Sequence, residues 1–124
     1  SISKKKTLFP KKKYWEIMSV TSIANGLMES VLERRMESIR PDNEKSKSFI
    51  EKQEVRIIRT INWLENNWNN YDESNLTMDQ IAIACALDYT IFRFNDDWKK
   101  NNPKLEKWFI NFKEKDFMKS TLPR

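Results

Sequence analysis

The chain has 124 residues, 39% of them hydrophobic, with a formal net charge of +5, one glycine, one cysteine and no histidine. This length suits a single domain with a modest core. The absence of histidine excludes Ser-His and Cys-His catalytic pairs and most zinc sites. A single glycine argues against Gly-rich phosphate-binding loops, and a single cysteine allows no internal disulfide. The composition therefore predicts no catalytic residue, no metal site and no self-sufficient enzyme, and it is typical of a cytoplasmic protein.

The positive charge is concentrated at the start of the chain. Residues 1–13 carry six lysines and no acidic residue, so subtracting +6 from +5 leaves −1 for the rest. We expect a solvated, lysine-rich lead-in here; nucleic-acid binding is the less favoured alternative, because no recognition motif accompanies the lysines. No apolar run approaches the ~20 residues that span a bilayer, so no membrane partner is expected. The first residue is serine rather than methionine, which predicts a longer or processed protein.

Helical spacing dominates the remaining sequence. From Tyr14 to Ile39 the apolar residues recur at steps of three and four, which predicts a long amphipathic helix. Arg40-Pro41 should end it, because proline disfavours helical geometry at the preceding residue. Ser48 is the expected N-cap of a second helix, whose apolar series runs to Trp68 with Glu54 as an interruption.

A third helix is predicted to begin at Thr77. Thr77 and Gln80 have the spacing of a capping box, in which each side chain binds the other residue's backbone N–H. These two residues are therefore expected to have a structural role. The run 81–87 is apolar on all faces, so we expect the helix near residues 77–92 to be buried centrally.

The last predicted helix begins at Asn102-Pro103, because proline is tolerated at the first helical position. We expect Phe117 and Met118 to form a short closing turn. No alternating strand pattern occurs in the sequence. The prediction is an all-α helical bundle of four to five main helices, with one domain over residues 14–122. The inner face of the last helix is expected to comprise Leu105, Trp108, Phe109 and Phe112.

Several short motifs follow one another in the order known from one protein family. Taken together over residues 8–122, they resemble the C-terminal all-helical domain of the cytosolic glutathione S-transferases. The sequence departs from the family pattern at Asn25, where the family commonly has Asp, and at Gln80, where its capping box usually ends in Asp. The matching segments are Ala24–Glu29, Arg40-Pro41, Phe49–Gln53, Leu64-Glu65, Leu76–Leu87 and Pro103–Phe112.

The resemblance implies a function that this chain would perform only in part. In the family, a thioredoxin-like N-terminal domain holds the glutathione site and the catalytic residue, and this sequence begins almost where that domain would end. The chain would be the helical substrate-pocket and dimerisation half of a homodimeric protein that conjugates glutathione, as co-substrate, to hydrophobic electrophiles. By itself it is expected to bind no cofactor. The alternative is a free-standing, non-catalytic protein-interaction module of the same fold.

The resemblance also assigns candidate site residues, all on the first long helix. Glu29, with Asn25 beside it, matches an acidic position that contacts glutathione of the neighbouring subunit; the alternative for Glu29 is an ordinary exposed helix acid. Met28, Leu32 and Arg35 resemble positions that line the electrophile pocket. An arginine there could bind a substrate carboxylate, although a solvated helix arginine is the more common situation.

Two further residues have a structural interpretation. Cys85 lies among apolar residues, so we expect packing rather than nucleophilic chemistry, because burial raises a thiol's pKa and blocks access to it. Gly26 lies inside a long predicted helix, where glycine costs about 1 kcal/mol relative to alanine. We therefore expect a partner element or ligand to approach the chain closely at Gly26.

Overall fold

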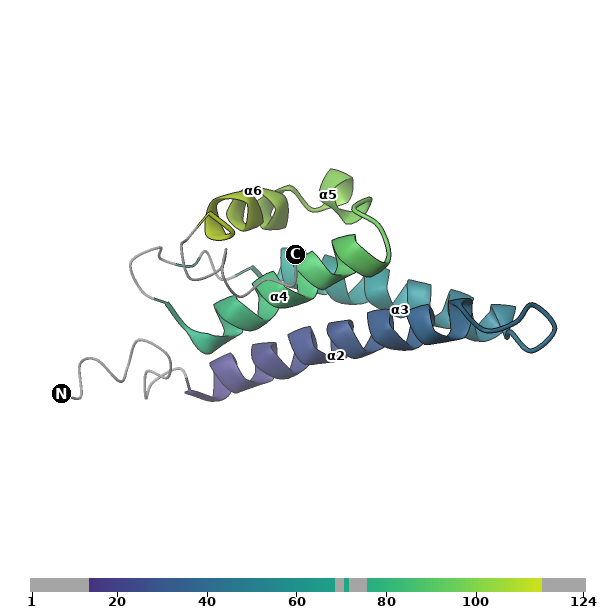
Figure 1. The fold of residues 1–124 in the computed structure, drawn as a ribbon. Helices are drawn as coiled ribbons and strands as arrows, with labels where there is room; N and C mark the ends of the chain where they lie inside the picture. Colours follow the sequence, from purple (N-terminus) through teal and green to yellow (C-terminus); the bar gives the residue numbers. More distant parts are fainter. Residues whose placement is uncertain (1–13, 69–70, 72–75, 115–124) are drawn as a thin grey trace.

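The computed structural model describes residues 14–68, 71 and 76–114. These residues form helices and their connections without any strand, so the all-α prediction is confirmed (Figure 1). The lysine-rich lead-in over residues 1–13 and the expected turn at Phe117 and Met118 lie outside the described residues. The helices are α2 (Tyr14–Ser38), α3 (Lys47–Asn66), α4 (Met78–Arg93), α5 (Trp98–Asn101) and α6 (Pro103–Phe112).

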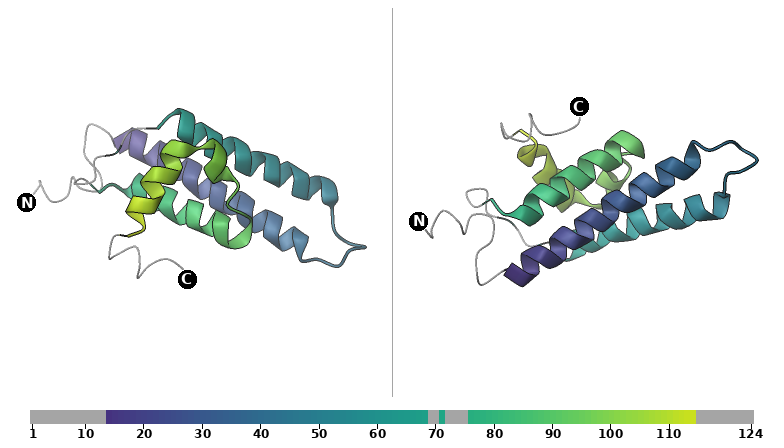
Figure 2. Two further views of the ribbon diagram at one scale, coloured as in Figure 1. Left: turned by 90° about the horizontal axis from the view of Figure 1, so that it is seen from above. Right: turned by 60° about the horizontal axis from the view of Figure 1, so that its bottom comes forward.

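The two longest helices form an antiparallel pair to which the other helices add. α2 packs against both α3 and α4, and these two contacts are the most extensive between elements. The short helices α5 and α6 lie across one side of this layer, where α6 contacts both α3 and α4 (Figure 2). The face of α2 that points away from α3, α4 and α6 is therefore left uncovered by the described helices.

The N-terminus of α3 differs from the expected one by two residues. Ser46, not Ser48, is the N-cap: its backbone is extended and its Oγ accepts a hydrogen bond from the Phe49 N–H at 3.2 Å. Glu37, near the end of α2, accepts a hydrogen bond from the Ser46 N–H at 2.7 Å. That bond, supported by Arg40, lowers the pKa of Glu37. The Glu37 carboxylate favours Ser46 as the N-cap because it fixes the backbone of Ser46 immediately before α3. The local sequence around Ser46 does not reveal this contact, because Glu37 belongs to α2.

The N-terminus of α4 also uses a different hydrogen-bond pattern from the expected capping box. Thr77 is the N-cap residue, but its side chain makes no capping bond to the backbone. Instead, Thr77 donates to the carboxylate of Asp79, and Gln80 Nε2 donates to Thr77 Oγ1 at 3.0 Å. Asp79 also accepts from the Gln80 N–H at 3.0 Å and from the Tyr71 hydroxyl at 2.5 Å. The buried carboxylate of Asp79 therefore organises this helix start, because its charge makes it the strongest acceptor available.

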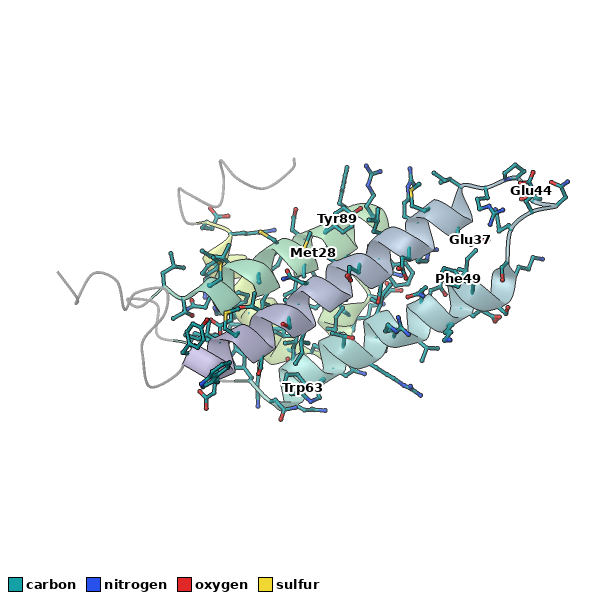
Figure 3. All side chains as sticks on the ribbon, turned by 90° about the horizontal axis from the view of Figure 1, so that it is seen from below. Met28, Glu37, Glu44, Phe49, Trp63 and Tyr89 are labelled. Atoms are coloured by element: carbon teal, nitrogen blue, oxygen red, sulfur yellow. The ribbon has the colours of Figure 1, made fainter. Side chains whose placement is uncertain are left out.

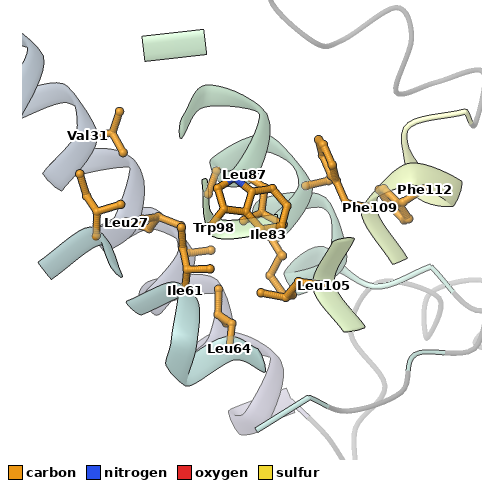
Figure 4. Close-up of a cluster of buried hydrophobic side chains, with 14 residues drawn as sticks. Leu27, Val31, Ile61, Leu64, Ile83, Leu87, Trp98, Leu105, Phe109 and Phe112 are labelled. Atoms are coloured by element: carbon orange, nitrogen blue, oxygen red, sulfur yellow. The ribbon is translucent and has the colours of Figure 1, made fainter. Parts of the chain in front are cut away.

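Helix α4 provides much of the hydrophobic core, as expected for the segment near residues 77–92. Its core side chains meet those of α2, α3 and α6 in one cluster (Figure 4). The burial is not uniform around the helix, because Ile81, Cys85 and Tyr89 are only half-buried. These residues recur at steps of four and so lie along one stripe of α4. The fully or nearly fully buried apolar residues of α4 are Ile83, Ala84, Ala86 and Leu87.

A long-range capping contact attaches the start of α6 to the end of α3. As predicted, α6 has Asn102 as its N-cap and Pro103 in its first turn, although no side-chain bond from Asn102 caps the helix. The carboxylate of Glu65 does so instead, accepting from the Lys104 N–H at 3.1 Å and the Leu105 N–H at 2.9 Å. A negative charge is favourable at a helix N-terminus, where unpaired backbone donors converge. Glu65 is buried despite its charge because these donors replace water.

We predict that Glu65→Ala lowers the free energy of unfolding by about 2 kcal/mol, because two backbone N–H groups lose a charged acceptor. Urea denaturation followed by circular dichroism measures this change. The control is Glu51→Ala, which removes an exposed acid from the same helix and should change stability by less than about 0.5 kcal/mol. Equal losses for the two variants would contradict the capping role.

We predict that Gly26→Ala stabilises the chain by about 1 kcal/mol, because alanine is the better helix former. Apart from its two chain neighbours and the backbone of its own helix, a methyl group at this position would meet no described atom within 4 Å, so the substitution causes no clash. The expected close approach at Gly26 is therefore not made by any described residue of this chain. Thermal denaturation measures the gain, and Ser22→Gly, an exposed site one turn earlier, should lower stability by about 0.5 kcal/mol. A loss on Gly26→Ala would indicate a contact with another part of the protein.

Candidate functional site

The five candidate residues all lie on α2, and their spacing places them on one side of the helix. Asn25, Glu29 and Leu32 are exposed, whereas Met28 and Arg35 are half-buried. Steps of three, four and seven residues bring side chains to neighbouring positions on a helix surface. The site residues therefore form one strip along α2, in which Asn25, Glu29 and Leu32 are exposed and Met28 lies at the edge that packs against the core.

Glu29 borders a shallow groove between α2 and α3 with a volume of about 300 Å³. Gly26 and Glu33 of α2 line the same groove, and Arg56 and Thr60 line it from α3. The carboxylate of Glu29 makes no ion pair with any described residue. It is thus an exposed negative charge beside a polar groove, which is suited to a ligand's ammonium group.

The groove residues of α3 were not among the sequence-based candidates. Arg56 and Thr60 are four residues apart and so share one face of α3, but helical spacing alone does not show which helix that face meets. The interruption of the apolar series at Glu54 belongs to a different contact, because Glu54 pairs with Arg34 of α2 at 2.8 Å. A step of two residues places Arg56 about 200° away from Glu54 around α3.

The apolar candidates lie toward the other neighbour of α2. Met28 packs against the hydrophobic cluster, and Figure 3 shows it along the edge where α2 meets α4. Tyr89 of α4 lies on the same side of this helix pair in that view. Leu32 is 46% exposed and Met36 is 55% exposed, so neither side chain is part of the core. Neighbouring exposed apolar side chains of this kind often mark a binding surface. This part of α2 and α4 therefore offers an apolar wall.

Arg34 stabilises the position of α2 against both neighbouring parts of the fold. Besides its ion pair with Glu54, its guanidinium lies 4.6 Å from the centre of the Phe94 ring, at the end of α4. Both groups are partly buried, so the interaction is stronger than a fully exposed pair would be. Arg34 thus has a structural role, and the neighbouring Arg35 is left with no ion pair to a described residue.

Cys85 does not have the surroundings of a reactive thiol. It is half-buried, and burial raises its pKa, with the Asp88 carboxylate acting in the same direction. A thiol with a raised pKa is protonated at neutral pH and is a poor nucleophile. The prediction that Cys85 is a packing residue agrees with this environment.

The described residues contain neither a candidate metal site nor a membrane-spanning helix. Over residues 14–68, 71 and 76–114, no three His, Cys, Asp or Glu side chains gather as a metal site requires. Among the helices in the same part of the chain, none is long and apolar enough to cross a membrane.

Comparisons with solved structures show that the fold of the chain is similar to part of several glutathione transferases. Neither a protein-family model nor a curated protein matches the sequence. A solved glutathione transferase family member from Pseudomonas fluorescens Pf-5, with bound glutathione, aligns over 94% of this chain and 58% of its own, with 25% identity and a TM-score of 0.86.

Two further solved structures agree with this match. A glutathione S-transferase from Methylobacillus flagellatus KT, with glutathione bound, aligns over 92% of this chain and 58% of its own, at 21% identity and a TM-score of 0.84. One from Methylobacterium radiotolerans JCM 2831, in complex with glutathione sulfonate, aligns over 91% and 55%, at 16% identity and a TM-score of 0.82. The chain thus spans less than two thirds of these proteins. Its fold is that of the C-terminal all-helical domain of the glutathione S-transferases.

Proposed function

We propose that the chain is the helical substrate-pocket and dimerisation half of a protein that conjugates glutathione to hydrophobic electrophiles. The observation that carries this proposal is the structural similarity, at a TM-score of 0.86, to a transferase that has glutathione bound. A thioredoxin-like half would bind glutathione and lower the pKa of its thiol. The resulting thiolate would then attack an electrophile held against this chain.

The apolar strip of α2 supplies the surface for that electrophile. Met28 and Leu32 provide the hydrophobic wall, and desolvation of an apolar substrate against them contributes to binding. Arg35 lies one turn beyond Leu32 and would bind a substrate carboxylate, because it has no ion pair with a described residue. No catalytic residue is assigned to this chain; its role is to hold the electrophile close to the thiolate.

Glu29 would contribute to glutathione binding across a homodimer. Its carboxylate is exposed and unpaired among the described residues, and a charge-assisted hydrogen bond to the γ-glutamyl ammonium would give it a partner. Asn25 lies one turn before Glu29 and would add a neutral hydrogen bond to the same group. The neighbouring groove, about 300 Å³ in volume, provides space for that approach.

The free-standing interaction module is the second candidate. It is favoured by the large exposed apolar residues on α2, because such residues often mark a surface that another protein covers. Both candidates are consistent with a cytoplasmic location, which the single cysteine supports. They differ in whether a thioredoxin-like half exists in the same protein.

The coding sequence upstream of Ser1 distinguishes the two candidates. The transferase proposal predicts a βαβ–ββα pattern of about 80 residues there. An immediate in-frame stop codon, or a sequence of another pattern, would contradict it and leave the interaction module.

In the longer protein, we predict that Glu29→Gln raises the KM for glutathione about tenfold and leaves kcat nearly unchanged, because a charged hydrogen bond to bound glutathione is lost. Steady-state conjugation of glutathione to an activated aryl halide measures both constants. The matched control is Glu33→Gln, which removes the same charge one turn further along the groove and should change KM by less than twofold. Equal effects of the two variants would contradict a specific role for Glu29.

We also predict that the 124-residue chain self-associates, because Leu32 and Met36 expose apolar side chains on the side of α2 that the other described helices leave uncovered. Sedimentation velocity across a range of concentrations should reveal a dimer. The double variant Leu32→Glu with Met36→Glu should raise the dimer dissociation constant at least tenfold, whereas Ile110→Glu on α6, also at an exposed apolar residue, should not. A single monomeric species at high concentration would contradict the prediction.

A further inference from the structure

The groove between α2 and α3 is bordered by charges of both signs. Glu29 lines it from α2, and Arg56 lines it from α3. Both side chains are exposed, and neither makes an ion pair with a described residue. A guanidinium and a carboxylate therefore border one groove of about 300 Å³ without neutralising each other, and this volume lies at the lower end of the range for small-molecule sites.

The charges of the groove discriminate among possible ligands. Glu33 is a second carboxylate in the lining, so a ligand that carries only negative charge is repelled by both acids. A ligand that carries only positive charge is attracted by the acids but repelled by Arg56. A zwitterion finds a partner for each of its charges. An α-amino acid group is such a zwitterion, because its ammonium and its carboxylate are bonded to the same carbon.

The α3 side of the groove has the hydrogen-bonding groups that an α-amino acid group needs. The guanidinium of Arg56 presents its N–H donors in a planar fork that matches a carboxylate. Thr60 lies one turn later and lines the same groove. Its hydroxyl donates to the Arg56 carbonyl oxygen at 2.8 Å, so the proton is already used and the lone pairs of the oxygen can accept a bond from an ammonium.

We propose that Arg56 is a specificity-determining residue that binds the α-carboxylate of the γ-glutamyl group of glutathione, while Glu29 binds the ammonium of the same group. The γ-glutamyl end of glutathione is an α-amino acid, so its two charges match the two sides of the groove. This inference rests on the proposed function, in which a thioredoxin-like half holds glutathione. Exposed ion pairs are weak, so the groove selects among ligands that the other half holds and does not retain glutathione by itself.

Two analogues of glutathione test the proposal in the longer protein. The 4-aminobutyryl analogue lacks the α-carboxylate, the glutaryl analogue lacks the ammonium, and both keep the reacting thiol. The ratio of kcat/KM for glutathione to kcat/KM for each analogue measures how strongly the protein prefers each charge. The reaction is conjugation to an activated aryl halide.

Arg56→Gln should lower the preference for glutathione over the 4-aminobutyryl analogue about fivefold, because only glutathione loses a contact. It should leave the preference over the glutaryl analogue unchanged, because both ligands then lose the same contact. Glu29→Gln should show the reverse pattern. A preference over the 4-aminobutyryl analogue that Arg56→Gln does not lower would overturn the proposal.

Arg59→Gln is the matched control. Arg59 is also exposed on α3 but does not line the groove, so its loss removes the same charge and should change both preferences by less than twofold. Equal effects of Arg56→Gln and Arg59→Gln would overturn the proposal, because they would reflect net charge alone. The absence of any conjugation by the unsubstituted longer protein would instead overturn the proposed function, and this inference with it.

Discussion

The buried stripe of α2 packs against α3 and α4 at the same time, and the remaining architecture depends on this double contact. Ala24, Leu27 and Val31 are completely buried in it. Because one side of α2 packs against both α3 and α4, no described helix covers the opposite side of α2. The candidate residues Asn25, Glu29 and Leu32 are exposed for this reason, so the core and the candidate site are two consequences of one packing arrangement.

Two buried carboxylates accept hydrogen bonds from groups at helix N-termini that hydrophobic packing alone would leave unpaired. Glu65 accepts two N–H groups at the start of α6, and Asp79 accepts donors from Thr77, Gln80 and Tyr71 at the start of α4. Each carboxylate lies at a helix N-terminus, where a negative charge is stabilised by the unpaired donors and the helix dipole. These contacts fix the ends of helices whose lengths are already determined by apolar periodicity.

The sequence predicts the helices well because helix formation depends on local spacing. Each of the four predicted helices begins within two residues of its observed start, and Asn102-Pro103 begins α6 as expected. The errors concern side chains whose partners are distant: Glu37 favours Ser46 over Ser48 as N-cap, and Asp79 replaces the simple Thr77–Gln80 exchange. The groove residue Arg56 was missed because no local pattern tells which helix lies opposite it.

We propose that a thioredoxin-like half binds glutathione and that this chain holds the electrophile. Calorimetric titration of glutathione into the 124-residue chain alone tests this proposal most directly. If the glutathione site belongs to a thioredoxin-like half and Glu29 only adds to it from a neighbouring subunit, the chain alone should show no saturable heat of binding at millimolar ligand. Saturable binding to this chain would contradict the account, because it would place the glutathione site among the helices described here.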